Sequence, residues 1–377
     1  MLTRIFDTIT MIAPAQIANF GGLFDRAGKL CRQPPLGIED TEGGPGNWMQ
    51  IKRLPGRKGH IELELYLRQC DATGFWEKPV EFTALMDELK HHPERDLIRI
   101  LSHKTLDEIS QTTSKPVDDG LSIQVVLHTP NGKTGLGLGG SASSAAIVMG
   151  IDALYGSPIA NTPQGQMQLL KLAGEGEGVA AGRVFYDNVA PLIVKGDMVY
   201  ITPGYDAEGC PIVQPMKCPA ELHVVTITPE FAMSTSHMTQ ALKDKTVGWQ
   251  IAEHSGDHKM EFMRGLLTDD LDLMIRNTRN LVTEPIRGAL IQGFSTAREI
   301  VEDMNATYDS RPEFAIGISG SGPTMYVMSR SLQSADQIGE EIHRALHEKD
   351  GIYSWWFCHT TNPNGAEVIG RTFQTAT

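Results

Sequence analysis

Hydrophobic and polar positions alternate in two early segments of the chain and follow a longer period between them. Apolar residues occupy every second position of HIELELYLRQC (60–70), and GLSIQVVLHTP (120–130) has a similar pattern. This pattern predicts a β-strand in each segment. Between them, residues 80–111 carry apolar side chains at helical spacing. Because proline removes a helical hydrogen bond and crowds the preceding turn, we expect this helical stretch to be broken near Pro93.

The middle of the chain predicts two helices and then strands. SSAAIVMGIDALYG (143–156) has the composition of a compact apolar helix that ends at Gly156. QMQLLKLAGEGEG (166–178) predicts a second helix, and APLIVKGDMVYITP (190–203) predicts a strand pair or hairpin.

The two ends of the chain complete an α+β pattern. TITMIAPA (8–15) predicts a short strand, and residues 31–60 are rich in Pro and Gly and predict an irregular segment with one strand. The second half predicts one strand, two helical segments and a strand–turn–strand unit, in ELHVVTITP (221–229), EFMRGLLTDDLDLMIRNT (261–278), FSTAREIVEDMN (294–305) and FAIGISGSGPTMYVMS (314–329). We therefore expect an α+β protein with two domains, 1–210 and 211–377, divided in the acidic, Pro-bearing stretch 203–220.

Composition and charge exclude several classes of partner. The chain has 377 residues, 41% of them hydrophobic, and a formal net charge of −13 without a cluster of Lys and Arg. Nucleic acids and anionic membranes require a basic surface, so neither is expected as a partner. No segment approaches the roughly 20 apolar residues that span a bilayer, and the N-terminus does not have the pattern of a signal peptide. We expect a cytoplasmic protein, and the sequence leaves a homodimer open.

The five cysteines favour reduced thiols. Their number is odd, they are widely scattered, and none forms a C-x-x-C pair. Neither a zinc site nor a disulfide framework is therefore expected.

The segment TGLGLGGSASSAAIVMG (134–150) places four glycines and three serines directly before an apolar helix. The free N–H groups and dipole of a helix N-terminus bind anions, and glycine lets a phosphate approach the backbone. The spacing matches neither the Walker loop nor the dinucleotide-binding fingerprint. Taken alone, the segment fits a phosphate loop and a tight helix entry equally well.

Two further segments resemble the motifs of the GHMP small-molecule kinase superfamily. PAQIANFGGLFDRAG (14–28) is similar to its N-terminal motif, the glycine loop to its phosphate-binding motif, and AIGISGSGPTMYVM (315–328) to its C-terminal motif. GEGEGVAAGRVFYDNVAPLIVKGD (174–197) and EPIRGALIQGF (284–294) resemble the homoserine kinase branch. The resemblance is weak in 61–119 and absent in 31–60.

The resemblance implies a fold and an activity. The fold is an N-terminal α/β domain with a left-handed βαβ unit and a ferredoxin-like C-terminal domain, with the active site between them. The activity is transfer of the γ-phosphoryl group of ATP, with Mg²⁺, to the hydroxyl of a small metabolite. The substrate expected first is L-homoserine, giving O-phospho-L-homoserine for threonine biosynthesis. A kinase for another hydroxylated metabolite and a catalytically silent small-molecule sensor are the alternatives.

The resemblance also assigns roles to individual residues. Glu177 and Ser141 would bind the metal, with Glu175 in reserve. The residues expected at the cofactor are Gly135, Gly137, Leu138, Gly139, Gly140, Ser141, Ala142, Ser143 and Ser144. Those expected to be catalytic are Asn188, Asp25 and Arg287, and those expected at the substrate are Asn19, Asp25, Asp187, Asn188, Thr235, Arg287 and Gly320.

Three positions depart from the family pattern on the substrate side. Phe185 stands where the family usually has His, Thr239 stands where an Arg would meet a substrate carboxylate, and Lys195 is an addition. Lys195 or His237 are candidates to replace the missing Arg.

Simpler structural roles also fit several of the candidates. Asp25 suits a helix N-cap, Arg287 suits an ion pair with Glu284, and Glu177 suits a solvated surface. GISGSGPT (317–324) suits a tight turn between strands.

Overall fold

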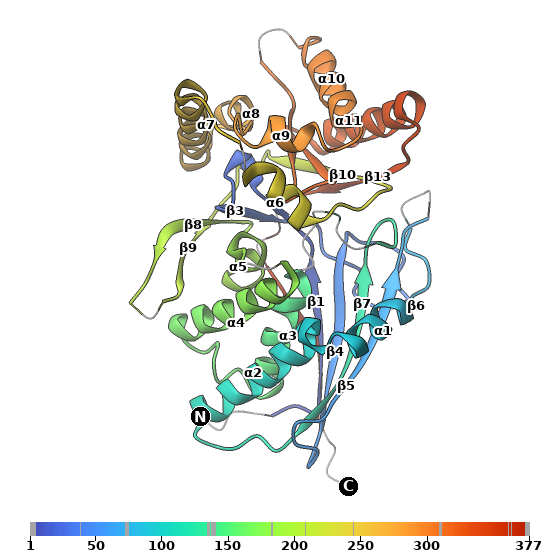
Figure 1. Cartoon of the computed structure of the whole chain (residues 1–377), viewed down its shortest axis with the longest axis vertical. Coiled ribbons are helices and arrows are strands. Elements are labelled where there is room, and N and C mark those ends of the chain that lie inside the picture. Colours follow the sequence, from blue (N-terminus) through green and yellow to red (C-terminus); the bar gives the residue numbers. More distant parts are fainter. Residues whose placement is uncertain are drawn as a thin grey trace.

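The computed structural model describes residues 5–37, 39–71, 75–133, 136, 141–181, 184–207, 209–243, 245–308, 311–360, 362 and 364–373, and only the backbone of 141, 180 and 181. Figure 1 shows two parts, one above the other, with helices packed on β-sheets in both. The predicted α+β class is confirmed.

The lower part in Figure 1 is built on a six-stranded sheet in the order β14-β1-β4-β7-β5-β6. β5 and β7 run parallel, and the other neighbouring strands pair antiparallel. The alternating segments 60–70 and 120–130 are both strands of this sheet, as predicted. The strand bounds are β1 Thr8–Pro14, β4 Gly46–Leu54, β5 Ile61–Arg68, β6 Val80–Glu81, β7 Gly120–His128 and β14 Glu367–Thr372.

Helices cover this sheet, and α3 packs directly on β1 and β4. The predicted break near Pro93 is confirmed, because a 3₁₀ turn (Pro93–Arg95) separates α1 from α2. α3 ends at Leu154, and Gly156 follows with a left-handed φ of 82°. The helix bounds are α1 Thr83–His91, α2 Leu97–Thr113, α3 Ser141–Leu154, α4 Pro163–Ala181 and α5 Tyr186–Val194.

The prediction of a strand pair or hairpin over 190–203 is wrong in its first half. Residues 190–194 are the end of helix α5, and only β8 (Met198–Tyr205) is a strand. α5 is buried against α3, α4 and β8, so its apolar residues carry no clear helical period. A short apolar run of this kind cannot be assigned from periodicity alone.

A second, four-stranded sheet has the order β2-β3-β8-β9. Its other strands are β2 (Gln16–Ala18), β3 (Ala27–Leu30) and β9 (Pro211–Met216), and a 3₁₀ turn (Phe20–Gly22) joins β2 to β3. β9 lies beyond residue 210 and β14 lies near the C-terminus, yet both pair with strands of the N-terminal half. The division of the chain at residue 210 stays a prediction.

The upper part in Figure 1 contains a four-stranded antiparallel sheet in the order β11-β12-β10-β13. In chain order these strands and the helices between them form the βαββαβ arrangement of a ferredoxin-like domain, as expected. The strands are β10 His223–Pro229, β11 Ala315–Ile318, β12 Met325–Ser329 and β13 Ser354–His359. The helices are α6 Thr235–Lys243, α7 Trp249–Thr268, α8 Leu271–Arg276, α9 Glu284–Gly288, α10 Phe294–Asn305 and α11 Leu332–Ala345, followed by a π-helical turn, Leu346–Asp350.

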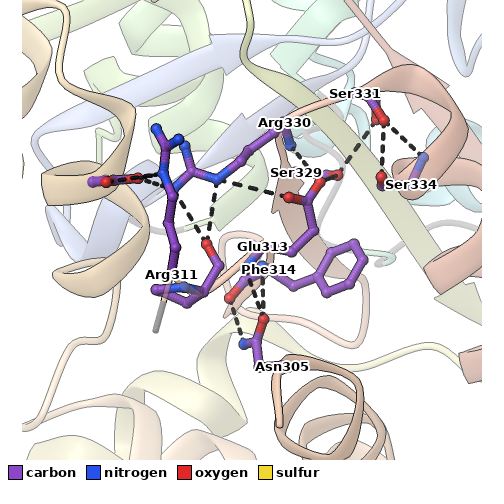
Figure 2. A network of polar contacts seen from close by, with 10 residues as sticks. Asn305, Arg311, Glu313, Phe314, Ser329, Arg330, Ser331 and Ser334 are labelled. Carbon is purple, nitrogen blue, oxygen red and sulfur yellow. Dashed lines mark hydrogen bonds and ion pairs between the residues drawn. The ribbon is translucent and has the colours of Figure 1, made fainter. Parts of the chain in front are cut away.

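A polar network holds the entry of β11 in place (Figure 2). Asn305, at the end of α10, accepts hydrogen bonds from the N–H groups of Glu313 and Phe314 at 2.9 and 3.0 Å. Arg330, just after β12, donates to the Pro312 carbonyl at 3.3 Å. These contacts fix both ends of the β11–β12 hairpin, whose turn carries the C-terminal sequence motif.

Two further properties follow from the described part of the chain. None of its helices combines the length and apolar character needed to cross a membrane. All five cysteines are free thiols, as predicted.

Candidate active site

The carbonyl of Gly320, in the turn between β11 and β12, is the point at which two predicted substrate residues meet. Asn19 donates a hydrogen bond to it from Nδ2 at 3.0 Å, and Arg287 donates to the same oxygen from its guanidinium. Asn19 belongs to the turn after β2 and Arg287 to α9. The fold therefore brings together three residues that are up to 301 positions apart in the sequence.

Asn19 also connects two of the predicted acidic residues. Its backbone adopts a left-handed φ of 61°, which Asn tolerates better than most residues. In this conformation its Oδ1 accepts from the Asp25 N–H at 2.7 Å, and its own N–H donates to Asp187 Oδ2 at 3.4 Å. Asp25 precedes strand β3 and not a helix, so the alternative role of helix cap is wrong.

Asp187 lies at the base of this arrangement and is fully buried. Burial raises its pKa to about 7, and the nearby charges of Asp25 and Glu177 add to this effect. Three carboxyl groups close together disfavour ionisation of the most buried one. A cation bound near them would reduce this penalty, so the arrangement suits a substrate ammonium group.

Glu177 on α4 is buried, with 6% of its surface exposed, and accepts a hydrogen bond from Asn188 Nδ2 at 3.3 Å. It is therefore not a solvated surface residue. Glu175, the reserve candidate, is partly exposed and pairs with Lys104. Gly176 explains the burial of its neighbour: a Cβ there would lie 2.6 Å from Ser144 Oγ, so glycine lets α4 approach α3 closely.

Few protein ligands for a metal converge at this site. Within the described residues there is no group of three or more His, Cys, Asp or Glu side chains able to hold a metal ion. Mg²⁺ is commonly held by one or two carboxylates together with phosphate oxygens and water. Glu177 fits that donor set.

The glycine loop itself lies largely outside the described residues. The predicted cofactor residues that lie outside the described part of the chain are Gly135, Gly137, Leu138, Gly139 and Gly140, together with the side chain of Ser141. Helix α3 begins at Ser141, two residues before the predicted start at Ser143, and its first turn carries the buried Ala142, Ser143 and Ser144. Ser143 Oγ hydrogen-bonds the Asn47 side-chain amide at 2.8 Å, which ties the start of α3 to β4.

The C-terminal motif contacts the glycine loop directly. The Thr324 N–H donates to the Leu136 carbonyl at 3.1 Å, and the Thr324 hydroxyl pairs with that of Thr228 on β10 at 3.0 Å. The GISGSGPT segment is thus a turn between strands, as the simpler interpretation had it, and it also supports the loop.

Sequence reasoning missed a cavity of about 220 Å³ beside the start of α3. It is mostly apolar, and its residues come from β5, β7, α1, α2 and the segment after β7. Such positions look like ordinary core in a sequence, because apolar side chains are usually buried. Its lining includes Leu65, Leu85, Leu89, Leu97, Leu127, His128, Lys133, Leu136 and Ser143.

The structure places the remaining substrate-side candidates as follows. Thr235 Oγ1 lies 3.2 Å from Ser321 Oγ, so α6 is joined to the same turn. The Arg287 guanidinium stacks over the Phe24 ring at 4.7 Å, and both residues line a small pocket together with Asn19 and Gly320. Lys195 is exposed at the end of α5.

Two earlier expectations concern Glu284 and Phe185: an ion pair between Arg287 and Glu284, and Phe185 in place of the usual His. Glu284 forms ion pairs with Arg279 at 3.2 Å and Arg298 at 2.6 Å, while Arg287 donates to Gly320. Phe185 directly precedes α5, partly buried.

Comparison with known proteins identifies the family. No family model matches the chain. The homoserine kinase of Chloroherpeton thalassium is 32% identical over 367 residues, which cover 96% of this chain and 99% of that protein. Among solved structures, the homoserine kinase of Cytophaga hutchinsonii has a TM-score of 0.74 at 24% identity, covering 98% of this chain and 99% of that chain. The mevalonate kinase of L. major has a TM-score of 0.58 at 12% identity, covering 93% and 95% of the two chains. The chain therefore belongs to the homoserine kinase family, within the GHMP kinase superfamily.

Proposed function

We propose that this protein transfers the γ-phosphoryl group of ATP to the side-chain hydroxyl of L-homoserine, giving O-phospho-L-homoserine and ADP. The observation that carries the proposal is the convergence of Asn19, Arg287 and Gly320 next to the Asp25, Asp187 and Glu177 carboxylates. The curated relative at 32% identity, a homoserine kinase, supports the same substrate.

The two sides of the pocket match the two charges of an amino acid. Arg287 provides a cation for the substrate carboxylate, and a guanidinium is well suited to bind a carboxylate. The acidic group of Asp25 and Asp187 favours the substrate ammonium, which would offset the burial and the repulsion from Asp25 that raise the pKa of Asp187. The substrate hydroxyl would then be directed toward Asn188 and Glu177.

The residues present also fit ATP and Mg²⁺. The mostly apolar cavity beside α3 suits an adenine base, and the glycine loop with the N-terminus of α3 suits phosphates. Glu177 and Ser141 are the proposed metal ligands. When bound, ATP supplies the phosphoryl group and Mg²⁺ offsets the negative charge of the phosphates.

Positioning is the main task of the protein side chains in this reaction. Asn188 is held by its hydrogen bond to Glu177, and its amide has no proton-accepting group of the strength of a carboxylate. We therefore assign Asn188 to orientation of the hydroxyl. Asp25 and Arg287 would hold the two charged ends of the substrate, and an aligned complex gives in-line transfer much of its rate.

An ADP-release assay over a panel of alcohols tests the proposal. The purified protein is incubated with MgATP and L-homoserine, L-threonine, mevalonate, pantoate or shikimate, and ADP is measured by a coupled reaction. We expect turnover with homoserine to exceed that with every other compound. Preferred turnover of another alcohol would overturn the substrate assignment, and MgATP binding without any turnover would indicate a sensor.

Free thiols and the use of ATP support a cytoplasmic location.

A further inference from the structure

A second cavity, of about 430 Å³, lies away from the site described above, between strand β13 and the segment 32–43. β13 is an edge strand of the C-terminal sheet. The segment 32–43 belongs to the part of the sequence that showed no resemblance to the kinase motifs. The lining residues are Arg32, Glu42, Gly43, Phe75, Asp336, Tyr353, Ser354, Trp355, Trp356, Phe357 and Cys358.

Hydrogen bonds hold the aromatic wall of this cavity in place. Trp356 donates from Nε1 to Asp336 at 2.9 Å, and Trp355 donates from Nε1 to the Asp71 carbonyl at 3.2 Å. The Tyr353 ring packs edge-on against Trp355, with centroids 4.9 Å apart. Because these side chains are already ordered, a ligand would not have to fix them on binding.

The charged groups around the aromatic wall have both signs. Arg32 is basic, and Glu42 and Asp336 are acidic. Arg32 would repel a ligand that carries only a positive charge, and the two carboxylates would repel a ligand that carries only a negative charge. A zwitterion satisfies both, and the aromatic rings offer contact area to an apolar side chain.

Ring contacts connect this cavity to the one proposed for the nucleotide. Phe357 stacks on Trp76, with centroids 5.9 Å apart, and the Trp76 ring meets His128 edge-on at 5.2 Å. His128 lines the cavity beside α3. Trp76 is 2% exposed, and its Nε1 donates at 3.2 Å to the carbonyl of Gly43, which lines the second cavity.

A backbone connection runs in parallel with the rings. The Glu230 N–H donates to the Tyr353 carbonyl at 2.9 Å, and Lys133 Nζ donates to the Glu230 carbonyl at 2.8 Å. Tyr353 lines the second cavity and Lys133 lines the cavity beside α3. The two cavities are thus connected along two separate routes, one through Trp76 and one through Glu230.

We propose that the second cavity is an effector site for a free α-amino acid with an apolar side chain, and that its occupancy changes the affinity for ATP. Arg32 binds the carboxylate, Glu42 binds the ammonium, and the side chain packs on Trp355. When the ligand displaces Phe357, the movement is transmitted through Trp76 to His128. When it displaces Tyr353, the movement is transmitted through Glu230 to Lys133. Such coupling is reciprocal, so ATP must alter the affinity for the amino acid by the same factor.

Calorimetric titration of the full chain, without turnover, tests the site. The probes are L-isoleucine, L-phenylalanine and L-tryptophan, with glycine as a zwitterion that lacks the side chain. We expect at least one of the three to bind at least ten times more tightly than glycine. Absence of binding by all three, or equal binding of glycine, would overturn the proposal.

Two variants and a matched control locate the binding. The double substitution Arg32→Ala with Glu42→Gln should weaken binding at least tenfold, whereas Glu39→Gln, an exposed change in the same segment, should leave it unchanged. Arg287→Lys should also leave it unchanged, since that residue belongs to the substrate pocket. Wild-type affinity in the double variant, or loss of binding in Arg287→Lys, would place the amino acid elsewhere and overturn the proposal.

A second titration tests the coupling. A non-hydrolysable ATP analogue with Mg²⁺ should shift the dissociation constant of the amino acid at least about fivefold, and saturating amino acid should shift that of the analogue equally. An unchanged constant in both directions would overturn the effector role.

Discussion

At the scale of single residues, the site depends on polar groups that are held by backbone partners. The Gly320 carbonyl accepts from both Asn19 and Arg287, and the Asn19 side chain in turn fixes the backbone of Asp25. A substitution at one of these residues therefore disturbs more than its own contact with a substrate.

We predict that Glu177→Gln lowers kcat by at least about 100-fold, because it removes the charge that would hold the metal, and such electrostatic groups contribute on the order of 10²–10³ in rate. The MgATP dependence of turnover measures the effect. Glu175→Gln is the matched control, since that residue lies two positions away and pairs with Lys104. Equal activities of the two variants would contradict the assignment of Glu177. Ser141→Ala is expected to reduce turnover in the same assay.

Arg287→Lys should raise KM for homoserine by roughly 10- to 100-fold, the equivalent of about 1.5–3 kcal/mol for a hydrogen bond to a charged group. Lysine keeps the charge but loses the planar donor set that reaches both Gly320 and a carboxylate. Arg298→Lys is the control, because Arg298 pairs with Glu284 and stacks on Phe294 instead. Steady-state kinetics distinguish the two, and an unchanged KM in Arg287→Lys would refute the carboxylate role.

His359 should make the protein less stable in mild acid. It is fully buried, and burial lowers its pKa from 6.5 to about 3, assisted by Lys29 and Arg32. Its Nδ1 accepts from the Arg32 N–H at 2.9 Å and its Nε2 contacts Thr226 Oγ1 at 2.8 Å, so the neutral ring is satisfied. Between pH 6.5 and 3 the unfolded chain binds a proton that the folded chain does not, and stability therefore falls as the pH falls.

The loss attributable to this residue between pH 7.0 and pH 5.5, one pH unit below the unfolded pKa, is on the order of 1 kcal/mol. Urea unfolding at pH 7.0 and 5.5 measures it, and His359→Gln should reduce the difference between the two pH values by that amount. His254→Gln, an exposed histidine on α7, should not. Identical pH dependence in wild type and His359→Gln would show that the prediction is wrong.

At the scale of elements, close approaches between helices and strands place the functional residues. A Cβ on Gly28 of β3 would lie 1.9 Å from the Asp187 carbonyl oxygen on α5. Pro191, four residues later in α5, has no N–H to occupy that carbonyl, so the helix can meet the strand there. Gly176 likewise allows a close approach, in this case of α4 to α3. Glycine at these two positions thus sets where Asp187 and Glu177 stand.

Gly28→Ala should destabilise the protein by about 1–3 kcal/mol, as other overpacked substitutions do, and should also reduce activity by shifting Asp187 and Asn188. Gly256→Ala on α7 is the contrasting change, since a Cβ there meets nothing within 4 Å. It should stabilise by about 1 kcal/mol through helix propensity. Urea unfolding and kcat of the two variants provide the comparison, and a neutral Gly28→Ala would contradict the packing.

At the scale of the whole molecule, the site exists only when the two parts of the fold are in contact. Asn19, Asp25, Glu177 and Asp187 come from the N-terminal half, and Gly320 comes from the ferredoxin-like sheet. The Gly21 N–H donates to the Tyr326 hydroxyl at 2.9 Å, which adds a buried link between the same two halves. Loss of the packing between them would separate the substrate pocket from the phosphate loop.

The five thiols report on the folding of the whole chain. Burial raises the pKa of Cys31 and Cys358 to about 12, and those of Cys70 and Cys218 are also raised. At pH 8 we therefore expect slow reaction with a disulfide reagent in the native state and five equivalents on unfolding in urea. Cys358 is the partly exposed member, so Cys358→Ser should remove most of the slow native reaction. Rapid labelling of several native thiols would contradict the packing.

The sequence predicted much of this architecture and some of the site. The strands with clear alternation, the break at Pro93 and the glycine stop after α3 could be predicted from local sequence, because periodicity, proline and glycine act on neighbouring residues. The 190–203 segment was misassigned because α5 is buried on several sides. The cavity beside α3 was missed because its leucines, spread over separate elements, have no sequence feature that distinguishes a cavity wall from a filled core.

By itself, the sequence determined the class of fold, the set of motifs and the chemical nature of the candidate residues, since these depend on residue type and local spacing. Only the tertiary structure decided that Asn19 and Arg287 share one carbonyl, that Glu177 is buried while Glu175 is partly exposed, and that Asp187 has a raised pKa. Each of these depends on distances between segments far apart in the chain, and on the exclusion of water when they pack.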